Sequence, residues 1–122
     1  MPSSRIALSI RSGTILKRMD NAILEEGMIC SDEPGIYIEG SHGIRLENMI
    51  VCRQAEKNQY GQFMEFEYLT YAPLDLDAMD VSLMEKRDVQ YLNEYHKAVY
   101  EKIAPYLTEE EAVWLKEATR EV

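Results

Sequence analysis

The sequence has few cysteine, histidine, proline and glycine residues, and it contains no cluster of basic residues and no long apolar run. Cys30 and Cys52 are too few for a disulfide framework and form no CxxC pair, so we expect two reduced core residues. Six glycines and four prolines without a repeat exclude a fibrous or low-complexity chain. No apolar run approaches the roughly 18 residues that span a bilayer, and the N-terminus lacks the apolar region of a signal peptide. We therefore expect a cytoplasmic protein with no membrane partner.

Negative charge dominates the composition. The 122 residues carry 13 Lys and Arg against 22 Asp and Glu, which gives a formal net charge of −9. Nucleic acids and anionic membrane surfaces bind positively charged proteins, so both are excluded as expected partners. With 46% hydrophobic residues, the chain can bury a core, and its length corresponds to one domain or part of one.

The hydrophobic pattern changes period near residues 75–80. Residues 1–79 are typical of strands and turns, and residues 80–122 are typical of helices, which predicts an α+β protein with segregated halves. A polar loop is expected at residues 54–62, and Tyr37 is expected to pack in the core. The expected strands cover residues 28–31, 36–38, 44–52 and 63–71, with weaker candidates at 6–10 and 15–19.

Two helices are predicted in the second part. The first begins near Glu85, with Ser82 and Glu85 as a capping pair, and is ended by Pro105. Its apolar stripe contains Val89, Leu92, Tyr95 or His96, Val99 and Ile103. The second runs over residues 109–120 behind a capping box of Thr108 and Glu111. Its predicted contact stripe contains Val113, Trp114 and Ala118.

Glu33 and Glu47 are the residues most suggestive of chemistry. Glu33 precedes a Pro-Gly turn, and Glu47 falls within the predicted strand at residues 44–52, among apolar neighbours. A carboxylate in such a strand is stabilised by a divalent cation or by an ion pair, here with Arg45 on the same face. It can equally face water on a one-sided sheet. Spacing by itself leaves these alternatives open.

The residues around these glutamates form two motif segments, LEEGMICSDEPGIY at residues 24–37 and GIRLEN at residues 43–48. These segments resemble the Xaa-Pro aminopeptidases (aminopeptidase P), which belong with methionine aminopeptidase and creatinase to the pita-bread metallopeptidase superfamily. The resemblance continues through FEYLT at 66–70, PLD at 73–75, YLNEYH at 91–96 and WL at 114–115, so that it covers about residues 20–122.

The resemblance implies the second half of a pita-bread catalytic domain, an antiparallel curved sheet over residues 1–79, followed by a C-terminal helical extension over residues 80–122. The complete enzyme would use two divalent metal ions to hydrolyse the bond between an N-terminal residue and a following proline. Mn²⁺ is the expected metal, with Co²⁺ or Zn²⁺ as alternatives. Glu33 would ligate one ion and act as the catalytic acid/base, and Glu47 would bridge both ions. Arg45 and Asn48 would orient Glu47 and balance its charge, with a plain strand salt bridge as the alternative for Arg45.

The family's two aspartate ligands and one histidine ligand, which lie upstream in its pattern, have no counterpart here. His42 is expected in an exposed turn and His96 on a partly buried or surface helix position, and neither occupies a ligand position. The resemblance therefore predicts a C-terminal fragment that binds metal weakly or not at all and is inactive alone. The alternative function is a non-catalytic interaction or dimerisation module. In either case we expect a homo-oligomer or pairing with an upstream half, because apolar strand faces would otherwise be exposed.

A calcium site at Asp75, Asp77 and Asp80 is disfavoured, because the cluster lacks the glycine and the distal glutamate of an EF-hand loop.

Overall fold

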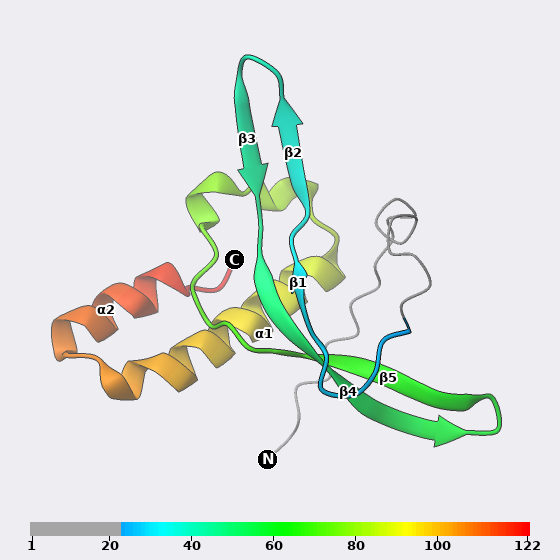
Figure 1. Cartoon of the computed structure of the whole chain (residues 1–122). Helices are drawn as coiled ribbons and strands as arrows, with labels where there is room; N and C mark the ends of the chain where they lie inside the picture. Colours follow the sequence, from blue (N-terminus) through cyan, green and yellow to red (C-terminus); the bar gives the residue numbers. More distant parts are fainter. Residues whose placement is uncertain (1–22) are drawn as a thin grey trace. The chain divides into compact units, whose positions relative to one another are not determined.

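The structure is a computed structural model that describes residues 23–122 (Figure 1). The strand candidates at residues 6–10 and 15–19 lie outside the described residues. The chain divides into two compact units between Thr70 and Tyr71, so residues 71–79 belong with the helices that follow them. Strands in the first unit and helices in the second confirm the predicted α+β class.

The first unit contains two antiparallel sheets. A three-stranded sheet has the order β1-β4-β5, and β2 pairs with β3 in a two-stranded ribbon. Figure 1 shows this ribbon continuing outward from the end of the β1–β4 pair. Between residues 23 and 70, the buried side chains are those of Ile50, Val51 and Cys52 on β4. The strands are β1 (Ile29–Asp32), β2 (Gly35–Ile38), β3 (His42–Arg45), β4 (Asn48–Asn58) and β5 (Gly61–Tyr68).

The polar loop predicted at residues 54–62 is wrong, because this segment forms the end of a hairpin. β4 continues to Asn58, turns through two residues and returns as β5 from Gly61, whose φ of 129° suits glycine. A bulge between Gln54 and Lys57 interrupts the register. The polar side chains of this hairpin face solvent, so it lacks the apolar alternation from which strands are recognised.

The second unit begins with two short 3₁₀ helices, η1 (Leu76–Ala78) and η2 (Val81–Leu83). Asp75 accepts a hydrogen bond from the Asp77 N–H, and Asp80 accepts one from the Ser82 N–H, so both carboxylates act as helix caps. The predicted capping pair of Ser82 and Glu85 is wrong, because Glu85 precedes the next helix without a side-chain cap.

The predicted first helix is confirmed as α1 (Lys86–Ile103), followed by η3 (Ala104–Tyr106) around Pro105. Four residues of its predicted stripe are buried, namely Leu92, Tyr95, His96 and Val99. No helix in the described part of the chain is long and apolar enough to cross a membrane.

Polar side chains of α1 hold two irregular segments through their backbones. The Tyr95 hydroxyl donates to the Ala72 carbonyl over 2.8 Å, and the Leu74 N–H donates to His96 Nε2 over 3.0 Å. At the other end of the unit, Asn93 exchanges two hydrogen bonds of 3.1 Å with the backbone of Val122. Neither segment forms a helix or a strand, so α1 provides partners that regular structure would otherwise supply.

Helix α2 (Glu109–Ala118) begins at the predicted capping box, in which the Thr108 hydroxyl and the Glu111 carboxylate each accept a hydrogen bond from the other residue's backbone N–H. The predicted contact stripe is wrong. Leu115 is buried, with 2% of its surface exposed, whereas Val113 and Trp114 are 71% and 64% exposed. Each residue of a helix turns about 100° from the last, and the short helix gave too little periodicity to identify its buried face.

We therefore expect Leu115→Ala to lower the free energy of unfolding by about 2–5 kcal/mol, because it removes a fully buried side chain. The matched substitution Val113→Ala, on the exposed face of the same helix, should change it by about 0.5 kcal/mol or less. Urea unfolding followed by circular dichroism at the helix band measures both values. Equal losses in the two variants would contradict this assignment of the buried face.

Candidate metal centre

Glu33 and Glu47 lie where one sheet gives way to the other. The β1–β4 pairing ends at Asp32 opposite Asn48, and the β2–β3 pairing begins at Gly35 opposite Arg45. Two pairs of residues take no part in either ladder: Glu33 and Pro34 between β1 and β2, and Leu46 and Glu47 between β3 and β4. The Leu46 N–H donates to the Pro34 carbonyl over 3.0 Å and holds the two interruptions together.

The prediction of one continuous strand over residues 44–52 is wrong. Pro34 has no N–H to donate and a restricted φ, so the ladder breaks opposite Leu46 and Glu47. Glu47 consequently lies at the break rather than in the middle of a strand. The side chains of Glu33 and Glu47 are 46% and 41% exposed, so neither carboxylate bears the cost of full burial.

Arg45 lies between the two glutamates. Its guanidinium is 3.5 Å from Glu33 Oε2 and 3.4 Å from Glu47 Oε2. These ion pairs are longer than charge-assisted hydrogen bonds and are half exposed, so each stabilises the fold by about 1 kcal/mol or less. An ion pair of Arg45 with Glu47 was one of the alternatives that the sequence left open; it is present, and the structure adds Glu33 to the same group. One positive charge therefore joins two carboxylates that the sequence separates by 14 positions.

Two hydroxyl groups that sequence reasoning missed support this junction. Ser31 donates to Glu33 Oε1 over 2.7 Å. Thr70 donates to Asn48 Oδ1 over 2.8 Å and accepts the Met49 N–H over 2.9 Å, which ties the backbone after Glu47 to the end of β5. Ser31 was detectable as a strand residue two positions from Glu33, on the same face. Thr70 gave no local signal, because only the pairing of β4 with β5 brings it to Asn48.

Tyr37 is 67% exposed, so the prediction that it packs in the core is wrong. Its ring lies over two glycines of the ribbon, Gly35 and its own cross-strand partner Gly43. A Cβ atom at either glycine would come within 2.7 Å of Tyr37 side-chain atoms. Gly35 and Gly43, one from each motif segment, therefore leave room for this tyrosine.

The donor set at the junction suits a hard cation but is incomplete. Carboxylates are good ligands for Mn²⁺ and Mg²⁺, and two-metal sites need about five protein ligands in fixed positions. Within residues 23–122, no group of three or more His, Cys, Asp or Glu side chains could hold a metal ion. Burial raises the pKa of Asp32, beside Glu33, which favours its protonated form and weakens it as a ligand.

The histidines and cysteines have other surroundings. His42 is exposed at the start of β3, where its Nδ1 lies 2.9 Å from the Ser41 hydroxyl. His96 is completely buried, so its predicted partial or surface exposure is wrong, and its Nε2 is occupied by the Leu74 N–H. Cys30 and Cys52 are free thiols, and burial raises the pKa of Cys52, which disfavours the thiolate that metals bind.

Comparison with known proteins identifies the family. Residues 62–122 match the profile described as the C-terminal region of peptidase_M24, and residues 4–54 match that of metallopeptidase family M24. The second match begins at residue 4, so the likeness extends upstream of residue 20, where the motif-based resemblance starts.

Individual relatives agree with these profiles. Aminopeptidase P1 of Arabidopsis thaliana is 36% identical over 105 residues, covering 84% of this chain and 16% of the plant protein. Xaa-Pro aminopeptidase 2 of Homo sapiens is 36% identical over 104 residues, covering 82% of this chain and 15% of the human protein. The chain thus spans about one sixth of the length of these curated relatives.

A solved structure shows the same fold. The crystal structure of X-prolyl aminopeptidase from Caenorhabditis elegans, a cytosolic enzyme with a di-nuclear active site, matches with a TM-score of 0.72 and 28% identity. The match covers 81% of this chain and 17% of that one.

The chain belongs to metallopeptidase family M24. Within the family it corresponds to a C-terminal portion of the aminopeptidase P proteins. The predicted fold, the second half of a pita-bread domain followed by helices, is confirmed.

The surroundings of His96 predict a pH dependence of stability. Burial lowers its pKa below the ordinary value of 6.5; the backbone of Arg120 opposes this shift in part, and the positive charge of Arg120 adds to it. Below pH 6.5 the unfolded chain therefore binds a proton that the folded chain does not, and stability falls as the pH falls through this window. The ring-proton signal of His96 in NMR should titrate with a midpoint below 6.5.

The chain has two histidines, so a His42→Gln variant leaves a single ring signal and assigns it. A His96→Gln variant should lose less stability between neutral and mildly acidic pH than the unmodified chain. A His96 midpoint above 6.5 would contradict the burial argument.

Proposed function

We propose that this chain provides Glu33 and Glu47 as two of the five protein ligands of a dinuclear metal site in an Xaa-Pro aminopeptidase. One observation carries the proposal: the two glutamates of the family-like segments meet at the junction of two sheets, on either side of one positive charge. Two carboxylates that converge on one point supply the oxygen ligands that hard divalent cations prefer. The membership of family M24 supports the same assignment.

The proposed roles follow from the chemistry of the side chains. Two divalent ions, when bound, supply Lewis acidity that lowers the pKa of a water molecule and polarises the scissile carbonyl. Glu47 would act as a ligand shared by the two ions, since a carboxylate has two oxygens. Glu33 would hold one ion and would carry a proton between the nucleophilic water and the leaving nitrogen.

Neighbouring residues orient these two carboxylates. The Ser31 hydroxyl directs Glu33 through Oε1, and Arg45 limits repulsion between Glu33 and Glu47. Asn48 fixes the backbone next to Glu47 through Thr70.

The substrate is a peptide with proline in its second position, and the ions are Mn²⁺ or, as alternatives, Co²⁺ or Zn²⁺. Residues 1–79, which include the first nine residues of the second compact unit, form part of the catalytic domain, and residues 80–122 form its helical extension. The protein is cytoplasmic, like the cytosolic relative from C. elegans. Because two carboxylates hold metal weakly, the chain alone is inactive and binds Mn²⁺ with millimolar affinity or not at all.

A second candidate function is supported by the exposed ribbon. Ile36, Tyr37, Ile38 and Ile44 are each 51–69% exposed, and β2 and β3 pair only with each other in the described part of the chain. Large exposed apolar side chains beside unpaired strand edges mark surfaces that associate. On this alternative the chain is a non-catalytic module that dimerises or pairs with an upstream half.

A chimera tests the ligand assignment. The corresponding C-terminal portion of the C. elegans X-prolyl aminopeptidase is replaced by residues 23–122 of this chain, and hydrolysis of a Xaa-Pro peptide is measured with Mn²⁺. Glu33→Gln should lower kcat by at least about 10²–10⁴-fold, because it removes an acid/base and a ligand. Glu47→Gln should lower both activity and the number of bound ions, measured by elemental analysis.

Glu39→Gln is the matched control, since Glu39 is an exposed glutamate in the turn of the same β2–β3 ribbon. It should leave activity and metal content unchanged. Full activity and full metal content in the Glu33 and Glu47 variants would refute the ligand assignment.

Metal binding and association, measured on the purified chain, test the two candidate functions. Calorimetric titration with Mn²⁺, together with measurement of the mass in solution, should show weak or no metal binding. Both candidates predict association. Under the first, adding an upstream half should create Mn²⁺-dependent hydrolysis of a Xaa-Pro peptide, whereas under the second the assembly is stable and does not respond to Mn²⁺. Tight binding of two ions that is lost in a Glu33→Gln, Glu47→Gln variant would show that association of chains completes the site, and the predicted inactivity would then be wrong.

A further inference from the structure

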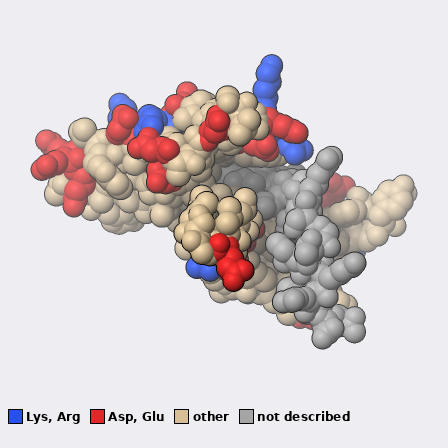
Figure 2. All heavy atoms as spheres, turned by 90° about the horizontal axis from the view of Figure 1, so that it is seen from above, with Lys and Arg blue, Asp and Glu red and all other residues tan. Residues whose placement is uncertain are grey.

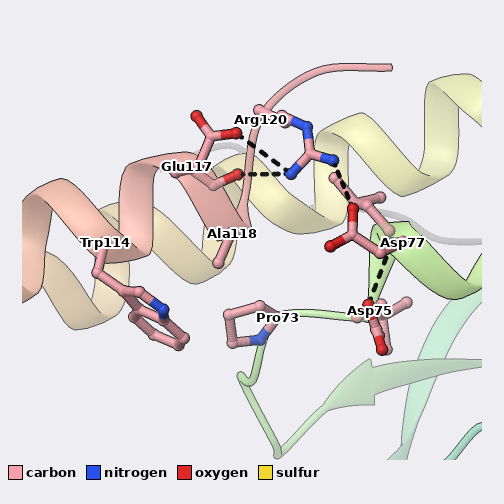
Figure 3. Close-up of a pocket in the computed structure, with 9 residues that line it drawn as sticks. Pro73, Asp75, Asp77, Trp114, Glu117, Ala118 and Arg120 are labelled. Carbon is pink, nitrogen blue, oxygen red and sulfur yellow. Dashed lines mark hydrogen bonds and ion pairs between the residues drawn. The ribbon is translucent and has the colours of Figure 1, made fainter.

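The second unit contains an open pocket of about 360 Å³. One wall is the segment from Pro73 to Asp77, and the other is the face of α2 that carries Trp114 and Glu117, continued by Arg120 (Figure 3). All of its lining residues belong to the second unit, so the pocket is defined within one compact body.

The pocket has apolar walls. In Figure 3, the indole of Trp114 and the ring of Pro73 lie on opposite sides of the open space, with the Ala118 side chain pointing toward it. Trp114 is 64% exposed, although burial of so large an apolar side chain would be favourable. An aromatic face that the described residues leave uncovered is therefore available to a ligand.

The rim of the pocket is acidic. It carries three carboxylates, those of Asp75, Asp77 and Glu117, against one guanidinium, that of Arg120. Arg120 lies 3.1 Å from Asp77 Oδ1 and 3.4 Å from Glu117 Oε1, so it already shares its charge between two of them. Asp75 Oδ1 accepts the Asp77 N–H, and Arg120 forms its ion pairs with the other two carboxylates and not with Asp75. The rim therefore keeps a formal excess of negative charge.

We propose that this pocket binds an arginine or lysine side chain of a basic peptide segment. Such a side chain has an apolar stem and a cationic end, which match the apolar walls and the acidic rim. A cation over the face of Trp114 gains a cation–π interaction, for which tryptophan is the best partner. The chain's charge of −9 also attracts a basic partner, and the face shown in Figure 2 carries more acidic than basic side chains among the residues coloured there.

Other occupants fit the pocket less well. An acidic segment would meet three carboxylates, and a purely apolar one would displace water from the rim without pairing those charges. The proposed peptide site uses no metal and none of the residues assigned to the metal centre. The test of the peptide site therefore does not depend on whether the proposed peptidase function is correct.

Trp114 is the single tryptophan of the chain, so intrinsic fluorescence reports directly on this pocket. The probe is the acetylated and amidated peptide Gly-Arg-Gly-Arg-Gly, compared with Gly-Glu-Gly-Glu-Gly. The basic peptide should change the fluorescence saturably, with a dissociation constant on the order of 0.1–1 mM. Raising the salt from about 0.05 M to about 0.5 M should weaken binding severalfold, and the acidic peptide should give no saturable change.

Two glutamates of α2 provide a matched pair of variants. Glu117→Gln removes a charge from the rim and should weaken binding about two- to fivefold. Glu110→Gln removes the same charge from an exposed position outside the pocket and should have no effect. Asp75→Asn is a second rim variant, and it keeps a side-chain oxygen to cap η1.

Circular dichroism identifies any variant that has lost its helices, and such a variant is replaced by the other rim variant. The proposal is overturned if the basic peptide gives no saturable change, if the acidic peptide binds equally well, or if Glu110→Gln weakens binding as much as the rim variants do.

Discussion

The break in strand pairing at Pro34 is the constraint on which the first unit depends. A proline cannot donate to the ladder, so the pairing of β1 with β4 cannot continue directly into that of β2 with β3. The segment opposite is also unpaired, at Leu46 and Glu47, and the Leu46 N–H donates one hydrogen bond to the Pro34 carbonyl. This arrangement frees both glutamate side chains from a regular strand face and lets them approach Arg45 together.

Hydrogen bonds between side chains and backbone groups also hold the irregular segments in place. In the first unit, Thr70 holds the Met49 N–H and Asn48, so that the end of β5 steadies the residues after the junction. In the second unit, Tyr95 and His96 hold the irregular segment that opens it. Such contacts satisfy backbone groups outside helices and strands, and they therefore allow functional residues to lie on irregular segments.

Local patterns were enough wherever the determining interaction was local. The capping box at Thr108 and the helix stop at Pro105 depend on residues within one turn of each other, and both were predicted correctly. The buried face of α2 was missed because a helix of 10 residues can present more than one plausible stripe, and packing selects Leu115. The hairpin at residues 54–62 was missed because its polar strands carry no apolar alternation.

The membership in a metallopeptidase family and the α+β class were both readable from residue order, because they rest on short motifs and on hydrophobic period. Tertiary pairing decided how the residues of those motifs meet. It brought Glu33 within reach of the arginine that also contacts Glu47, added Thr70 from 22 positions away, and buried His96 completely. Register and packing join residues distant in the chain, and no local window of sequence contains that information.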